Sequence, residues 1–344
     1  MSTKLVLQDN SVFEGKSFGF EGSVAGEVVF ATGMTGYPEA LTDPSFAGQI
    51  LVLTYPIIGN YGVPHRSQWE SVKIQIKGLV VSTYNETPSH YSSVLSLQQW
   101  LINEKIPAVE IRDTRFLAKK IRTHGAMLGK IISNKNISFE DPNKINLVAK
   151  VSQKGVTVEG SGKFTIVQID CGTKRSISKC LRKRNVRVIT IPWNMNPLSL
   201  KEKFDAVLVS NGPGNQKMVP ETIKSVQALL KRKIPILGIC LGNQILALAA
   251  GGKTRKLKFG HRGQNQPCIL VGTKRCYLTT QNHGFVVSKI PAGFKQWFVN
   301  ANDQTNEGLI HSHLPIMSVQ FHPEATPGPT DTEWIFDYFL KKLK

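Results

Sequence analysis

The segment IPILGICLGNQILALAA (residues 234–250) joins an apolar strand pattern to a helical pattern through two closely spaced glycines. Ile234–Ile239 is a short apolar run of the kind found in buried strands, and Asn243–Ala250 has helical character and precedes Gly251-Gly252. Glycines two positions before and two after Cys240 permit a tight strand-to-helix turn, which lifts this side chain above the sheet. The pattern predicts a nucleophilic cysteine at a helix N-terminus, where the helix dipole favours the thiolate.

Strand and helix patterns alternate on the N-terminal side of this segment. Strands are expected over Phe164–Asp170, Val186–Pro192 and Phe204–Ser210, and helices over Thr173–Arg184 and Pro220–Lys231. Such alternation with short connections indicates a parallel, doubly wound sheet. From Gln266 onward strand patterns follow one another, so the sheet is expected to be mixed, and Asp331–Leu343 should form a last amphipathic helix.

The first part of the chain is rich in strand patterns. Strands are expected over Lys4–Gln8, Ser11–Glu14, Glu27–Ala31, Gln49–Thr54 and Lys73–Ser82, and helices over Ser93–Glu104 and Thr114–Thr123. Residues 133–163 are richer in Asn, Ser, Lys and Gly, and SQKGVTVEGSGK (residues 152–163) has the composition of a linker. We therefore expect a strand-rich domain over 1–150, a linker over 151–163 and an α/β domain over 164–344.

The composition is that of an ordinary globular protein, with 344 residues, 41% hydrophobic and 19% charged. No apolar run approaches the ~18–20 residues needed to span a bilayer, so a soluble protein without a membrane partner is expected. The N-terminal residues show neither a signal core nor an Arg-rich presequence, which favours a cytoplasmic location. The five cysteines include no CxxC pair and are interpreted as reduced thiols. Apart from Cys240, they are expected to be structural.

The net charge of +19 raises the question of a nucleic-acid partner, because clustered cations release counterions from phosphates. The basic residues are spread along the chain, however, and no RNA-binding aromatic motif, zinc-finger spacing or basic zipper accompanies them. A solvated surface, or a face that docks an acidic partner, is the favoured interpretation. Nucleic-acid binding is the weakest of the functional hypotheses, and no nucleic acid is expected among the partners.

A base for the cysteine is offered by FHPEA (residues 321–325). His322 and Glu324 are two residues apart, so on an extended backbone their side chains point the same way. Glu324 can then hold the imidazole tautomer while His322 faces the thiol. A His near a Glu is common on protein surfaces, and the pair gains weight only together with Cys240.

A third motif, SNGPG (residues 210–214), follows an expected strand. Ligands of doubly wound sheets bind at the carboxyl ends of the strands, and backbone N–H groups there can form an oxyanion hole. Alone, the motif would be interpreted as a Pro-Gly turn. His311 and His313 lie on one strand face, but no third ligand accompanies them, and no metal site is expected.

Together these motifs resemble the class I glutamine amidotransferases. The N-terminal half resembles the small subunit of carbamoyl-phosphate synthase in the stretches GEVVF (26–30), MTGYPE (34–39), LTDPS (41–45) and LTYPIIGN (53–60). The stretches DTR (113–115), QNHGF (281–285) and TPGP (326–329) add to this resemblance. It covers nearly the whole chain and implies an α/β fold in which a strand-rich N-terminal domain precedes a doubly wound amidotransferase domain with a mixed sheet.

The resemblance also implies roles for individual residues. Cys240 would attack the side-chain amide of L-glutamine and form a thioester, His322 would protonate the departing ammonia and activate water, and Glu324 would orient His322. Backbone N–H groups of Gly212 and Leu241 would form the oxyanion hole. The substrate-binding positions would be Ser45, Gly212, Gly214, Leu241, Gln244, Asn282, Gly284 and Phe285. Because Ser45 lies in the N-terminal domain, the site is expected at the domain interface.

A partner is implied as well. The ammonia would pass to a large subunit that uses ATP and Mg²⁺ to make carbamoyl phosphate for arginine and pyrimidine synthesis. This chain has no GxxxxGK[ST] loop, so no cofactor is expected in it. The alternative is a degenerate docking or regulatory subunit that does not hydrolyse glutamine. Departures from the family pattern at Asn243, Asn215-Gln216 and Ser176 motivate it, whereas the complete Cys–His–Glu set favours the enzyme.

Overall fold

The computed structural model describes residues 3–343, so residues 1, 2 and 344 of the expected domains lie outside the described residues. The chain forms two compact units that divide between Ile145 and Asn146, a few residues before the expected end of the first domain. The expected linker, 151–163, belongs to the second unit. Within it, Thr157–Glu159 forms strand β10, which pairs with β12 (Val186–Pro192). This short strand is part of the sheet, consistent with its β-branched Thr157 and Val158.

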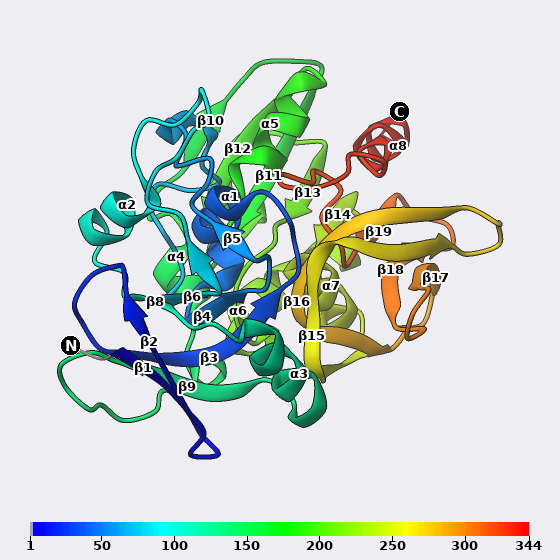
Figure 1. The fold of residues 1–344 in the computed structure, drawn as a ribbon. Coiled ribbons are helices and arrows are strands. Elements are labelled where there is room, and N and C mark those ends of the chain that lie inside the picture. The colour runs from blue at the N-terminus through cyan, green and yellow to red at the C-terminus, as the bar shows by residue number, and fades with distance from the viewer. Residues whose placement is uncertain (1–2, 344) are drawn as a thin grey trace. The chain divides into compact units, whose positions relative to one another are not determined.

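The first unit is built on a closed barrel of seven strands (Figure 1). In barrel order the strands are β1 (Thr3–Leu7), β2 (Val12–Ser17), β8 (Ala108–Glu110), β6 (Gly78–Val81), β4 (Gln49–Leu53), β3 (Val24–Ala31) and β9 (Met127–Ile132). Alternation sets the inner face: Leu5 and Leu7 are buried, whereas Lys4 is only partly covered. Closure pairs every strand of the barrel on both sides and leaves no free edge.

Helices and short strands complete the first unit. They are α1 (Tyr37–Thr42), α2 (Leu97–Asn103), α3 (Thr114–His124) and the two-residue pair β5 (Ile57–Ile58) and β7 (Thr83–Tyr84). Helix α3 begins as the sequence predicts, because the Asp113 carboxylate accepts a hydrogen bond from the Phe116 backbone N–H at 2.7 Å. It ends at Gly125, which has a φ of 103°. The strand expected over Lys73–Ser82 forms only from Gly78 to Val81.

The second unit contains a ten-stranded sheet in the order β10-β12-β11-β13-β14-β19-β18-β17-β15-β16. The strands not yet given are β11 (Phe164–Asp170), β13 (Ala206–Val209), β14 (Ile236–Ile239), β15 (Lys253–Leu270), β16 (Cys276–Lys289), β17 (Phe294–Asn300), β18 (Asn306–His311) and β19 (Ile316–Val319). Strands β12, β11, β13, β14 and β19 are parallel, and the remaining pairs are antiparallel. The predicted doubly wound, mixed sheet is therefore confirmed.

Helices cover both faces of this sheet. They are α4 (Val148–Val151), α5 (Arg175–Lys183), α6 (Pro220–Lys231), α7 (Leu241–Ala249) and α8 (Trp334–Lys341). Ile166 of β11 packs with residues of α5 and α8, whereas its neighbour Val167 packs with residues of α6 and α7. Burying an aliphatic or aromatic side chain contributes roughly 1.5–3 kcal/mol, and strands covered on both faces accordingly have continuous apolar sequences.

The cysteines are free thiols. Cys171, Cys180, Cys240 and Cys268 are buried, and Cys276 is exposed. Burial raises the pKa of Cys171 and Cys268, and it raises the pKa of Cys180 to about 12. These three thiols are therefore poor nucleophiles at neutral pH, in agreement with their predicted structural role.

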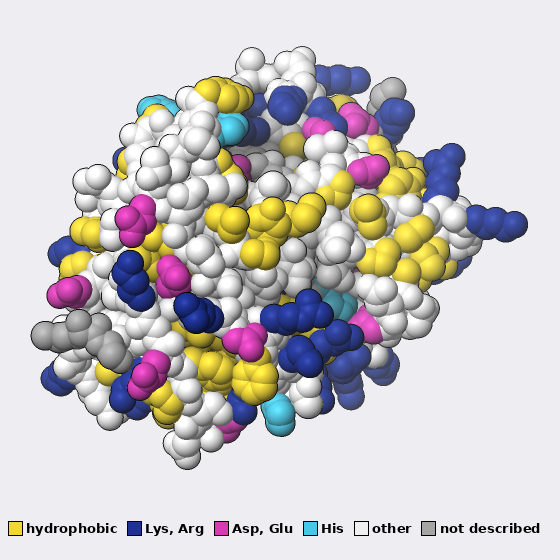
Figure 2. Space-filling view, viewed as in Figure 1, with side chains coloured by type: hydrophobic (Ala, Val, Ile, Leu, Met, Phe, Trp, Pro, Cys, Tyr) yellow, Lys and Arg dark blue, Asp and Glu magenta, His cyan; other side chains and the backbone are white. Residues whose placement is uncertain are grey.

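Lys and Arg side chains are distributed unevenly over the visible face. Figure 2 shows several of them gathered below its centre and others spread around it, with Asp and Glu side chains in between. Among residues 3–343, no helix combines the length and the apolar character needed to cross a membrane.

Candidate active site

Cys240 occupies a strained turn between β14 and α7. Its φ of 54° and ψ of −99° lie outside the regions favoured by side-chain-bearing residues, and such strain persists only where the surroundings hold it. The backbone N–H of Cys240 donates to Val319 O at 2.8 Å. A Cβ on Gly242 would lie 2.1 Å from Val209 O, so only glycine fits there. The predicted strand-to-helix turn is present, with Cys240 at the helix N-terminus.

The thiol of Cys240 is almost fully buried, with 2% of the residue exposed. Its Sγ donates to the backbone oxygen of Asn282 on β16 at 3.6 Å. Gln320, which follows β19, places its side-chain Nε2 3.7 Å from the same sulfur. Strands β16 and β19 therefore both contribute to the surroundings of the thiol.

His322 and Glu324 form a buried pair in the segment after β19. Nδ1 of His322 donates to Oε1 of Glu324 at 2.6 Å, and the backbone N–H of His322 donates to Thr280 O at 2.9 Å. Burial disfavours the imidazolium, but the charge of Glu324, its hydrogen bond and the proximity of Cys240 outweigh it and raise the pKa of His322. Among the described residues, Nε2 of His322 has no hydrogen-bond partner of good geometry, so it remains available to a reacting group.

Lys174 places a positive charge beside this pair. It immediately precedes α5, it is buried, and its Nζ donates to Glu324 Oε1 at 3.0 Å and to Ala325 O at 2.6 Å. Burial opposes ionisation of Glu324, but the charges of Lys174 and His322 lower the pKa of this carboxyl well below its usual range. Sequence reasoning missed Lys174, because one more lysine beside a basic helix carries no distinguishing signal.

The loop 210–214 follows β13 and meets the start of α7. A Cβ on Gly212 would lie 2.1 Å from Cys171 O and 2.8 Å from the side chain of Leu241. The loop is held by the hydroxyl of Ser210, which accepts from the Cys171 N–H at 2.9 Å, and by the amide oxygen of Asn211. The structure thus brings together Gly212 and Leu241, the two residues expected to form the oxyanion hole.

Several residues expected to bind substrate also gather near Cys240. Gln244 on α7 donates through Nε2 to Phe285 O at 3.0 Å, and Phe285 lies on β16 with Asn282 and Gly284. Gly214 has a φ of 78° and packs near Leu147.

Ser45 belongs to the first unit, where it is buried in the turn Pro44–Phe46. Its N–H donates to the Asp43 carboxylate at 2.8 Å. A site at the domain interface stays a prediction.

The departures from the family pattern occupy well-bonded positions. Asn243 is buried; its Nδ2 donates to Gln320 Oε1 at 3.1 Å, and its Oδ1 accepts from the Ser318 hydroxyl at 2.8 Å. Asn215 caps the turn that follows, because its Oδ1 accepts from the Lys217 N–H at 3.0 Å, and Gln216 hydrogen-bonds Thr254. Ser176 is buried within α5. None of these residues displaces Cys240, His322 or Glu324.

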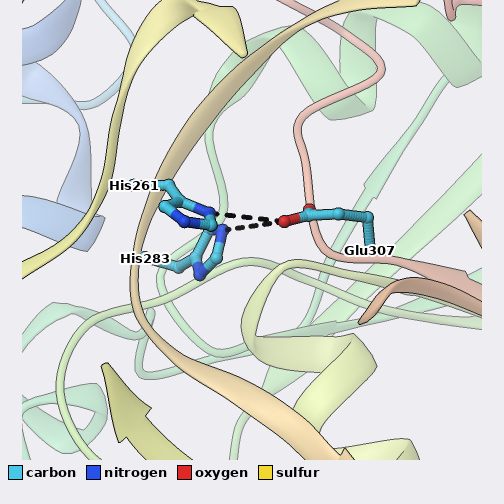
Figure 3. A group of neighbouring side chains, drawn as sticks. All are labelled: His261, His283 and Glu307. Carbon is cyan, nitrogen blue, oxygen red and sulfur yellow. Dashed lines mark ion pairs between the residues drawn. The ribbon is translucent and has the colours of Figure 1, made fainter. Parts of the chain in front are cut away.

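A second titratable group lies in the same unit (Figure 3). His261 of β15, His283 of β16 and Glu307 of β18 bring ligand-type atoms within 4.8 Å of one another. Nδ1 of His261 lies 3.3 Å from Glu307 and Nε2 lies 2.9 Å from Asp303. Burial favours neutral His261, but hydrogen bonds and charges from Glu307 and Asp303 prevail and raise its pKa. The ring nitrogens of both histidines have hydrogen-bond partners in Gln281, Asp303 and Phe285, whereas Oε2 of Glu307 is buried without a partner among the described residues.

The pair His311 and His313 is a weaker candidate for a metal site. Nδ1 of His311 accepts hydrogen bonds from the backbone N–H groups of His313 at 3.1 Å and Leu314 at 3.0 Å, so this nitrogen caps a turn.

Comparison with known proteins extends this description. Residues 167–342 match the family model "Glutamine amidotransferase class-I", and residues 5–131 match "Carbamoyl-phosphate synthase small chain, CPSase domain". The two matches fall in the second and first units, respectively.

Relatives match over almost the whole chain. The carbamoyl phosphate synthase small chain of Sulfurisphaera tokodaii is 45% identical over 98% of this chain and 96% of its own length. The multifunctional protein CAD of Squalus acanthias is 49% identical over 98% of this chain, and the mitochondrial carbamoyl-phosphate synthase [ammonia] of Homo sapiens is 46% identical over 99%. The chain spans only 16% and 24% of these two longer proteins. With its amidotransferase unit and its small-chain unit, the chain belongs to the family of carbamoyl-phosphate synthase small chains.

Proposed function

We propose that this chain is a glutaminase that hydrolyses the side-chain amide of glutamine and delivers the ammonia to a larger, ATP-using subunit. The observation that carries the proposal is the pairing of a strained cysteine turn with a buried His–Glu pair. Cys240 sits at a helix N-terminus, and Nδ1 of His322 is 2.6 Å from Glu324. A covalent cysteine divides amide cleavage into two easier steps.

In the first step, Sγ of Cys240 forms a bond to the amide carbon of glutamine. The thiol proton is carried by Nε2 of His322 in a thiolate–imidazolium pair, and His322 transfers it to the departing nitrogen, so that the C–N bond breaks and ammonia leaves. The product on the enzyme is a γ-glutamyl thioester. Glu324 accepts the Nδ1–H of His322 and so keeps Nε2 directed at the reacting atoms.

In the second step, His322 removes a proton from water, and the resulting hydroxide attacks the thioester carbon. The C–S bond breaks, glutamate leaves, and the proton returns to the Cys240 sulfur. Acid–base assistance of this kind accelerates such reactions by about 10²–10⁴-fold.

Both steps pass through a tetrahedral intermediate with a negatively charged oxygen. We propose that the backbone N–H groups of Gly212 and Leu241 stabilise this oxyanion. Their loops approach closely, and loss of one such donor typically costs about 10²–10³ in kcat. We assign the remaining contacts to glutamine to Ser45, Gly212, Gly214, Leu241, Gln244, Asn282, Gly284 and Phe285. The positions of Gln244, Asn282 and Phe285 near Cys240 support this assignment.

The partner would be a carbamoyl-phosphate synthase large subunit. It would use ATP and Mg²⁺ to convert the ammonia into carbamoyl phosphate for arginine and pyrimidine synthesis. The matches to the small-chain family and to the multifunctional and mitochondrial proteins support this assembly. Neither nucleic acid nor a membrane is expected among the partners. We place the chain in the cytosol, which cell fractionation would check.

The test is glutamate release from glutamine, measured for the chain alone and with a large subunit from the same source. Activity that disappears in Cys240→Ala, persists in Cys276→Ala and rises with the large subunit is the expected result. Carbamoyl phosphate made from ammonium by the complex, without glutamate release by either protein, would contradict hydrolysis. It would instead identify a docking subunit that does not hydrolyse glutamine.

A further inference from the structure

Lys174 is buried, and its local structure does not stabilise its positive charge. It occupies the N-cap position of α5, but its side chain makes no capping hydrogen bond. A positive charge at a helix N-terminus opposes the helix dipole, and a buried ammonium loses its hydration. Its presence there therefore calls for a specific compensating partner.

That partner is the carboxylate of Glu324. Nζ of Lys174 lies 3.0 Å from Oε1 of Glu324, the same oxygen that accepts the Nδ1–H of His322 at 2.6 Å. One carboxylate oxygen is thus held from two directions, by a lysine ahead of α5 and by the imidazole of the proposed catalytic pair. The 2.6 Å bond from Lys174 to Ala325 O fixes the backbone directly after Glu324.

Lys174 also connects this pair to the proposed oxyanion loop. Its backbone N–H donates to the side-chain oxygen of Asn211 at 3.1 Å, and Asn211 immediately precedes Gly212. A single residue therefore touches both the segment that carries His322 and Glu324 and the loop that faces Leu241.

Lys174 and His322 are the cations that lower the pKa of Glu324 most, and the nearby Cys180 thiol is neutral because burial and the charge of Glu324 raise its pKa. When the thiolate and imidazolium form, Cys240, His322, Glu324 and Lys174 together have no net charge. Such neutrality is favourable in a buried site, where uncompensated charges are costly.

We propose that Lys174 is a positioning residue of the active site, which keeps Glu324 ionised and aimed at Nδ1 of His322 and ties this pair to the oxyanion loop. This inference rests on the proposed glutaminase function. The contacts of Lys174 include Glu324, Ala325 and Asn211, and we assign its effect to Glu324.

Removal of the ammonium has a defined consequence. Lys174 lowers the proton affinity of both Glu324 and His322, so without it the coupled pair holds its last proton more tightly. The acid limb of the kcat/KM profile should then move to higher pH. A shift of about one unit is the effect expected for a nearby charge, and it reduces kcat/KM about ten-fold at pH values below the limb.

The experiment measures pH profiles of glutamate release by the complex with the large subunit, for wild type, Lys174→Met and Lys174→Arg. Lys183→Met, an exposed lysine at the end of α5, is the matched control. We expect the acid limb to shift in Lys174→Met and to keep its wild-type position in Lys174→Arg and Lys183→Met. A rate in Lys174→Met that falls equally at every pH would overturn the proposal, because a merely structural residue would act in this way.

A double variant covers the case in which Lys174→Met fails to fold. Lys174→Met/Glu324→Gln removes both charges together and leaves no buried ion unpaired. If Lys174 acts through Glu324, the double variant should match Glu324→Gln in kcat/KM to within about three-fold. A further large loss in the double variant would contradict the proposal. Absence of glutamate release by wild type would instead contradict the glutaminase function itself.

Discussion

Gln320 forms a hydrogen-bonding clamp on the cysteine turn, because its Nε2 donates to the backbone oxygen of Cys240 at 3.3 Å. Its Oε1 accepts from Nδ2 of Asn243 at 3.1 Å and from Nε2 of Gln244 at 3.2 Å. The residue is fully buried at the end of β19, so these bonds have no competition from water. A residue with positive φ, such as Cys240, needs surroundings of this kind to hold it.

Gln320→Met therefore tests the clamp. The substitution keeps the volume but leaves several buried polar groups without their partner, and each such group costs about 1–3 kcal/mol. We expect the free energy of unfolding to fall by roughly 2–4 kcal/mol and glutamate release to decrease. Denaturant titration of the variant beside Gln227→Met, an exposed glutamine on α6, measures the difference. Equal stability of the two variants would contradict the clamp.

Local patterns predicted the doubly wound part of the fold closely. The structure reproduces Phe164–Asp170, Val186–Pro192 and Pro220–Lys231 residue for residue. Parallel strands buried on both faces have uninterrupted apolar sequences, and a proline at the first helical position marks the start of α6. The cysteine turn could be predicted because its glycines lie beside it in sequence.

Local sequence patterns did not predict some other elements of the fold. Strands were predicted only from Gln266 onward, so most of β15 was missed, because Lys253–Leu270 contains many polar residues and a glycine with positive φ. Closure of the barrel depends on pairing of β9 with β1 and β3, which local periodicity does not encode. Lys174 and Gln320 were missed for a related reason, since each contacts residues far away in the chain.

Gly242→Ala should disrupt the turn directly. The new Cβ would lie 2.1 Å from the backbone oxygen of Val209, which cannot move without disturbing β13. We expect a loss of at least about 2 kcal/mol in stability and a severe loss of glutamate release. Gly155→Ala is the matched control, because a Cβ there meets no atom within 4 Å. Thermal unfolding of both variants decides the point, and a stable, active Gly242→Ala protein would show that the turn relaxes.

The ionised Glu324 should make the free energy of unfolding depend on pH in acidic solution. Its pKa is lowered in the folded chain, so its contribution is present above its unfolded pKa of about 4.3 and is lost as pH falls through the folded value. The difference in unfolding free energy between wild type and Glu324→Gln should therefore be constant near neutrality and shrink below about pH 4.3. Denaturant titrations across this range measure it. A difference that grows on acidification would have the wrong sign.

His322 should show the opposite dependence. Its pKa is raised in the folded chain, so its stabilising contribution is complete below the unfolded pKa of about 6.5 and is lost as pH rises through the folded value. The advantage of wild type over His322→Gln should accordingly be largest in mildly acidic solution and decline in alkaline solution. The same titrations, extended to high pH, measure this decline. An advantage that increases with pH would mean that His322 is neutral in the folded chain.

The thiols should differ in their reactions. Cys276 is the exposed one, so a bulky maleimide should modify it first, whereas burial raises the pKa of Cys171, Cys180 and Cys268 and protects them. A chloroketone analogue of glutamine should instead label Cys240, because substrate contacts would bring its electrophilic carbon to the sulfur. Peptide mass spectrometry of wild type and of Cys276→Ala after each reagent identifies the labelled residue, and excess glutamine should slow only the chloroketone reaction. Labelling of Cys240 that glutamine leaves unaffected would separate this thiol from the substrate site.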